Sequence, residues 1–133
     1  MTNKKEFNIV IDGTQITARD LQSVMPGVQS LIVEKILHYS KMRKFIVCDE
    51  DGNIYVRKSL PEWTSELEFL YLDGRRKTLT KSYICKAFRA LVDSGVLEKL
   101  GSSLNRVNSY RVCMDVLKKQ LKHLYGDINC YGN

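Results

Sequence analysis

The sequence lacks long apolar runs, internal repeats and any Pro/Gly-rich linker, and only two of its 133 residues are proline. No stretch approaches the roughly 18 apolar residues that a membrane-spanning helix needs. The first residues include Lys4, Lys5 and Glu6 and contain no apolar segment of a secretory signal. We therefore expect a cytoplasmic protein of one main folding unit, without a membrane partner.

Closely spaced metal ligands and familiar catalytic motifs are also missing. The four cysteines, Cys48, Cys85, Cys113 and Cys130, include no C-x-x-C pair, and structural zinc sites normally take their ligands from such pairs. The sequence has no H-E-x-x-H, no phosphate-binding G-x-x-x-x-G-K-[ST], no G-x-G-x-x-G and no G-x-S-x-G. We therefore predict no bound metal, no cofactor and no enzymatic activity.

The sequence does have an uneven distribution of charge. Residues 1–74 hold nine basic and eleven acidic side chains, whereas residues 75–133 hold twelve basic and four acidic ones. All of the excess positive charge therefore lies in the carboxyl-terminal half, and no acidic residue lies between Arg75 and Ala90. This concentration indicates a polyanionic partner. If charge were the only evidence, we would favour a solvated surface that keeps the protein soluble.

The amino-terminal third predicts a β-hairpin and two helices. Asp12-Gly13 lies between two β-prone runs and is typical of a tight hairpin turn. A short helix is expected over residues 18–24, so that residues 1–27 form a hairpin with a helical lead-in. In residues 28–42 apolar side chains recur at helical spacing in a broad stripe, which predicts a central, buried helix.

The middle of the chain predicts a second hairpin over residues 45–56 and then another helix. Ser59 and Glu62 have the spacing of a capping box, so we expect this helix to begin at Ser59. The residues expected on its buried face are Trp63, Leu67 and Leu70. Residues 72–79 are predicted to form a loop that carries the basic triplet Arg75-Arg76-Lys77.

A further helix is expected over residues 81–92, capped by Thr80. Its apolar stripe comprises Ile84, Ala87, Phe88 and Leu91. At 100° per residue, Ser82, Lys86 and Arg89 fall on roughly the opposite side. Two strands with a polar loop between them follow, then a helix over residues 114–125 and a flexible tail over residues 126–133.

This order of elements is that of a winged helix-turn-helix, here over residues 28–113. We therefore predict an α+β fold: a winged helix-turn-helix with an N-terminal β-hairpin and a C-terminal helix. The third helix of such a domain enters the major groove of DNA. A helix can do so only if one face is buried in its own domain and the other is polar and free of negative charge. Residues 81–92 meet this condition, and their amino end can also donate N–H groups to a phosphate.

Three segments carry a resemblance to a known family. They are a helix ending in His-Tyr (SLIVEKILHY, residues 30–39), an aromatic hairpin followed by a Ser…Glu-Trp helix (residues 54–63), and ICKAFRALVDSGVL (residues 84–97) with NSYRV (residues 108–112). Together they resemble the N-terminal winged-helix domain of phage- and plasmid-type replication initiator proteins, the replisome organisers. The resemblance implies a role in DNA replication initiation or transcription regulation. It also implies a phage or host replication protein as partner, in the cytoplasm of a bacterium or a phage-infected host cell.

The residues that we expect to contact double-stranded DNA are Arg75, Arg76, Lys77, Lys81, Ser82, Lys86, Arg89 and Arg106. Lys86 and Arg89 would reach base edges or phosphates, because Arg is the usual reader of guanine. The triplet would hold phosphates and fix the register. Arg106, in the predicted wing loop, would reach the minor groove or the flanking backbone. The alternative for each is a solvated surface position.

A second hypothesis is a winged-helix module that binds protein instead of DNA, as an adaptor or inhibitor of a host complex. The apolar face of the last helix, formed by Leu117, Leu121 and Leu124, would then dock on a partner or form a homodimer. Packing of this face on the protein's own core is the other interpretation.

Overall fold

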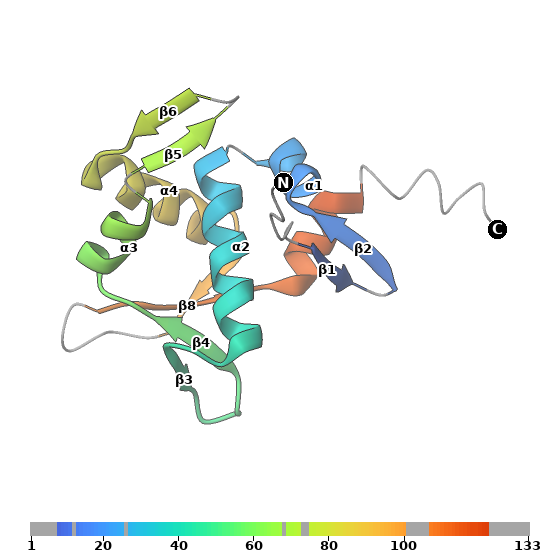
Figure 1. Cartoon of the computed structure of the whole chain (residues 1–133). Coiled ribbons are helices and arrows are strands. Elements are labelled where there is room, and N and C mark those ends of the chain that lie inside the picture. Colours follow the sequence, from blue (N-terminus) through green and yellow to red (C-terminus); the bar gives the residue numbers. More distant parts are fainter. Residues whose placement is uncertain are drawn as a thin grey trace, which may run out of the picture.

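The computed structural model (Figure 1) describes residues 8–11, 13–25, 27–67, 69–72, 75–100 and 107–122. The elements in chain order are β1 (Asn8–Ile11), β2 (Thr14–Thr17), α1 (Ala18–Val24), α2 (Gly27–Met42), β3 (Ile46–Cys48), β4 (Ile54–Arg57), α3 (Leu60–Leu67), β5 (Phe69–Leu72), β6 (Arg75–Thr78), α4 (Lys81–Asp93), β7 (Leu97–Lys99) and β8 (Ser109–Val112). A further helix covers residues 114–122. The predicted α+β class is confirmed.

The largest sheet is antiparallel, and its strand order is β3-β4-β8-β7. It joins distant parts of the sequence, because Val56 of β4 is the register partner of Tyr110 of β8. On the other side of β8, Leu97 of β7 pairs with Val112. The predicted hairpin over residues 45–56 and the two strands after the helix over residues 81–92 are therefore neighbours in one sheet.

Local signals define the amino-terminal elements as expected. β1 and β2 form a hairpin, and Gly13 in its turn has a φ of 81°, which a glycine adopts without steric cost. Thr17 caps α1: its side chain accepts a hydrogen bond from the Asp20 N–H, and Asp20 accepts one from the Thr17 N–H.

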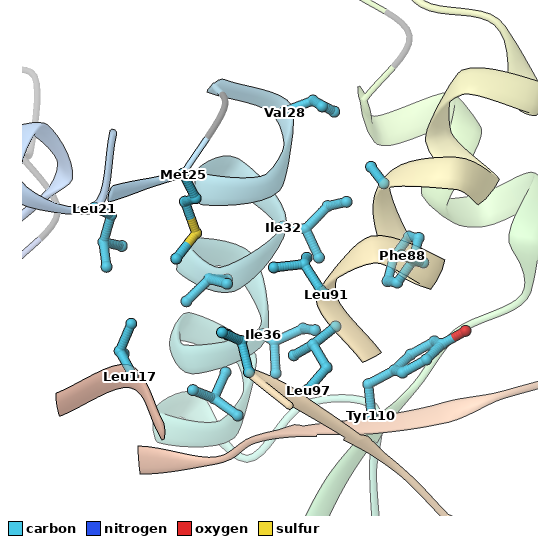
Figure 2. Close-up of a cluster of buried hydrophobic side chains, with 14 of the residues drawn as sticks. Leu21, Met25, Val28, Ile32, Ile36, Phe88, Leu91, Leu97, Tyr110 and Leu117 are labelled. Carbon is cyan, nitrogen blue, oxygen red and sulfur yellow. The ribbon is translucent and has the colours of Figure 1, made fainter. Parts of the chain in front are cut away.

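The centre of the molecule is α2, which Figure 1 shows between the amino-terminal hairpin on one side and α3 and α4 on the other. Its residues Ile32, Val33 and Ile36 are completely buried. Figure 2 shows Ile32 and Ile36 facing Leu91 of α4 and Leu97 of β7. The predicted central helix is thus confirmed, and it forms the wall against which α4 packs.

The segment between α3 and α4 corrects two predictions. Residues 72–79 are not a loop, since β5 and β6 form an antiparallel hairpin in which Leu72 pairs with Arg75. Accordingly, α3 ends at Leu67 and Leu70 lies in β5 instead of on the helix. The sequence Phe-Leu-Tyr-Leu is β-prone, and the Asp73-Gly74 that follows it is the same turn-forming pair as Asp12-Gly13. These signals outweigh the helical spacing from Trp63 to Leu70.

The described part of the last helix favours core packing over a docking or dimer surface for its apolar face. Leu117 is completely buried and Leu121 is 3% exposed, both within the core. In Figure 2 Leu117 lies on the side of α2 opposite Phe88. The described part of this face is therefore covered by the protein's own chain. Leu124 and the predicted tail over residues 126–133 lie outside the described residues.

Candidate nucleic-acid interface

The candidate interface is built on α4, and Thr80 fixes where this helix begins. The Thr80 side chain accepts a hydrogen bond from the Tyr83 N–H at 3.1 Å. Inward-facing Ile84, Phe88 and Leu91 are at most 4% exposed and hold the helix on the core. The helix ends at Asp93, followed by Gly95 with a φ of 87°, a conformation that favours glycine.

The outward face of α4 has the exposure that the sequence predicted. Lys81, Ser82, Lys86 and Arg89 are all exposed. Within the described ranges, the ion pairs are Lys35–Glu66, Lys58–Glu66 and Arg111–Glu98. The three cations of the α4 face are therefore not neutralised by a described carboxylate. This uncovered cationic face is available to a polyanion, whereas contact with DNA itself stays a prediction.

The structure describes some, but not all, of the other predicted contact residues. Arg75, Arg76 and Lys77 belong to β6, which is separated from α4 by only Leu79 and Thr80. The fold thus brings the backbone of the basic triplet next to the amino end of α4. The side chains of the triplet are not among those that the structure describes. Arg106 lies outside the described residues altogether.

Two exposed residues were missed by the sequence interpretation. The side chain of Tyr83 is 47% exposed. It lies at the edge of the α4 apolar stripe, where the spacing alone does not decide between core and solvent. Lys99 is exposed on β7, and its register partner is Tyr110 of β8. The pairing of β7 with β8 places Lys99 near α4, and the sequence alone does not indicate this proximity.

A buried charged cluster joins α2, α3 and the segment between β4 and α3. Lys58 is only 7% exposed and makes an ion pair with Glu66, which also accepts a hydrogen bond from the Tyr39 hydroxyl. The Lys58 ammonium lies 4.6 Å from the Tyr39 ring centroid and 4.8 Å from that of Trp63. Lys35 Nζ lies 3.4 Å from Glu66 Oε1. We call Tyr39, Lys58 and Glu66 the Lys58 cluster.

The surroundings of the Lys58 cluster shift two pKa values. Burial by itself would raise the pKa of Glu66, but the hydrogen bonds from Lys58 and Tyr39 and the charges of Lys58 and Lys35 outweigh it, so the pKa lies below its ordinary value. Burial and the hydrogen bond to Glu66 raise the pKa of Tyr39. At neutral pH Glu66 is therefore a carboxylate and the Tyr39 hydroxyl is protonated.

Among the described residues, no three His, Cys, Asp or Glu side chains are grouped so as to hold a metal ion. No helix within the described ranges has the length and apolar character needed to cross a bilayer. The chain matches no protein-family model, no curated protein and no solved structure.

Replacing Thr80 with alanine is expected to lower the free energy of unfolding by about 1 kcal/mol, because the Tyr83 N–H loses its acceptor at the start of α4. Urea denaturation followed by circular dichroism measures this loss. Thr80→Ser keeps the hydroxyl and is the matched control. Equal stability of Thr80→Ala and Thr80→Ser would contradict the role of this cap.

Proposed function

We propose that this protein is a winged-helix protein that binds double-stranded DNA by inserting α4 into the major groove. The observation that carries the proposal is the outward face of α4, with Lys81, Lys86 and Arg89 exposed and unpaired with any described carboxylate. The opposite face is buried, so the helix is held rigidly in the domain. A helix with one buried and one uncovered cationic face is the element that such domains present to DNA.

The order and pairing of the elements support the winged-helix assignment. Helices α2, α3 and α4 are followed by the β7–β8 hairpin, the position of a wing. The strand before α3, β4, pairs with β8 and so ties the hairpin to the helices. One difference is the β5–β6 hairpin between α3 and α4, where a helix-turn-helix motif normally has a turn of about three or four residues. This hairpin ends beside the amino end of α4, and there its basic triplet would contact phosphates.

The biological setting that we propose is initiation of DNA replication in a phage or plasmid, or regulation of transcription. It rests on the resemblance of residues 30–112 to replication initiators. A replication protein of the phage or host is then the expected protein partner. The competing hypothesis of a protein-binding module is weakened, since Leu117 and Leu121 belong to the core.

A double substitution on α4 tests DNA binding. Lys86→Gln with Arg89→Gln is expected to weaken binding to a duplex from the DNA flanking the protein's own gene by about 10- to 100-fold, since a good base contact discriminates by about 1–3 kcal/mol. The difference in affinity between this duplex and a scrambled one should also shrink. Fluorescence anisotropy at fixed salt measures both quantities.

The matched control is Lys119→Gln with Lys122→Gln. This variant removes the same charge from exposed positions of the last helix, which Figure 1 shows away from α3 and the amino end of α4. It is expected to bind DNA within about threefold of the native chain, because long-range charge effects are screened. Equal losses of DNA affinity in the two double variants would show that the chain attracts DNA only non-specifically. A native chain that does not bind DNA would refute the proposal.

A further inference from the structure

A pocket of about 460 Å³ lies between α4, the β7–β8 hairpin and the start of α3. Its volume is within the range of small-molecule sites, about 300–1,000 Å³. None of the DNA contacts proposed above requires this cavity, and no motif in the sequence predicts it. We call it the α4–wing pocket.

The apolar lining of the α4–wing pocket includes aromatic side chains from three elements, beside Leu60 and Val92. Trp63, Phe88 and Tyr110 all line it. The rings of Phe88 and Tyr110 are stacked with their centroids 4.8 Å apart, and Trp63 and Phe88 are 5.3 Å apart. Figure 2 shows the Tyr110 oxygen pointing away from the cluster of Ile36 and Leu97. Each of these rings is at most 7% exposed, so this lining offers a flat apolar group only the small part of each ring that faces the pocket.

The remaining lining is rich in hydrogen-bond donors and positive charge. Lys58, Arg89 and Lys99 line the pocket together with a single carboxylate, Asp93. Lys58 is already paired with Glu66, but Arg89 and Lys99 form no ion pair with any described residue. Two cations are therefore left for a ligand.

Strand register helps to place these two cations in one pocket. Lys99 is directly opposite Tyr110 in the β7–β8 pair, so both side chains project from the same face of the sheet. Tyr110 stacks on Phe88, the residue that precedes Arg89 on α4. Arg89 and Lys99 thus line the same pocket from two different elements, α4 and β7.

The Tyr110 hydroxyl adds a neutral donor. It accepts a hydrogen bond from Asn108 Nδ2 at 3.2 Å and donates to no described group, so its own proton remains available. Burial raises the pKa of Tyr110, which keeps this proton in place at neutral pH. Asn108 and Tyr110 both line the pocket.

We propose that the α4–wing pocket binds a small phosphate monoester with an aromatic group, the phosphate lying between Arg89 and Lys99 and the ring against Phe88 and Tyr110. A phosphate monoester carries a charge of about −1.5 to −2 at neutral pH, which matches two cations, and its three terminal oxygens suit a guanidinium, an ammonium and a hydroxyl. This site does not depend on the proposed DNA binding. It would, however, place the ligand on Arg89 and so link the two.

Titration of the full chain with phenyl phosphate, followed by amide NMR, tests the site. Saturable shifts are expected at Cys85, Val92 and Asn108, with a dissociation constant below about 1 mM. Inorganic phosphate lacks the ring, and phenol lacks the charge. Each is therefore expected to bind at least about tenfold more weakly than phenyl phosphate.

Two substitutions separate this pocket from general cationic attraction. Lys99→Gln and Arg89→Gln are each expected to weaken phenyl phosphate binding about tenfold, since each removes a charge-assisted contact. Both residues are exposed, so the native amide spectrum should be retained. Lys86→Gln removes the same charge from α4 but lies outside the pocket lining, and it should leave binding unchanged.

Three results would overturn the proposal: shifts that do not saturate, inorganic phosphate binding as tightly as phenyl phosphate, or Lys86→Gln weakening binding as much as Lys99→Gln. Failure of DNA binding is a separate outcome, measured on duplex DNA without phenyl phosphate. If the chain binds phenyl phosphate but no duplex DNA, the pocket proposal stands and the proposed DNA-binding function is refuted.

Discussion

Replacing Glu66 with alanine is expected to lower the free energy of unfolding by about 3–5 kcal/mol. Glu66 is the only described carboxylate that forms an ion pair with Lys58, whose side chain is 7% exposed. Without it, a buried ammonium remains among the rings of Tyr39, Phe45 and Trp63. Cation–π attraction in a desolvated site is worth about 2 kcal/mol, which offsets only part of the loss. Urea denaturation followed by circular dichroism measures the effect.

The control for this prediction removes both charges. Lys58→Met with Glu66→Leu should cost much less than Glu66→Ala alone, because replacing a buried ion pair by apolar side chains of similar volume is often neutral. Lys35→Gln should cost less than about 1 kcal/mol, since Lys35 is 35% exposed and its pair with Glu66 is solvent-screened. A double variant as unstable as Glu66→Ala would contradict the electrostatic explanation.

The stability lost in Glu66→Ala is expected to depend on pH in one direction. The pKa of Glu66 is lowered in the folded protein, so its stabilising contribution is fully present above the unfolded value of about 4.3. The contribution is lost as the pH falls through the lower folded value. The difference in stability between the native chain and Glu66→Ala is therefore largest near neutral pH and narrows in acid.

Local signals explain why α4 and its surroundings could be predicted. Thr80 as the cap, the apolar stripe ending at Leu91 and Gly95 after the helix each act within a few residues. The same holds for the capping box at α3, where the Ser59 N–H donates to Glu62 at 2.8 Å and this bond lowers the pKa of Glu62. Such features are determined by the chain close to them.

Features that depend on tertiary contacts could not be predicted in this way. The Lys58 cluster joins Tyr39 to Glu66, 27 residues apart, and no spacing in the sequence indicates that Lys58 is buried. In the α4–wing pocket, the register of β7 and β8 sets the lining residues Lys99 and Tyr110 opposite each other. The β5–β6 hairpin was missed for a different reason. Helical spacing and β-propensity competed in the same residues, and the turn-forming pair favoured the hairpin.

Raising the salt concentration from about 50 to 200 mM is expected to weaken DNA binding several hundredfold, because about five phosphate contacts give a log–log slope near −4.5. For this prediction the five cations taken to contact phosphate are Arg75, Arg76, Lys77 and Lys81, with Arg106 on the flanking backbone. Anisotropy titrations at a series of NaCl concentrations measure the slope.

Of the five cations taken to contact phosphate, Lys81 is the one whose exposed side chain the structure describes, so Lys81→Gln is the sharpest single test. It should reduce the slope by about 0.9, whereas Lys119→Gln should leave it unchanged. A flat slope in the native chain would exclude a phosphate-dominated interface, and a slope that Lys81→Gln does not alter would place the contacts away from the amino end of α4.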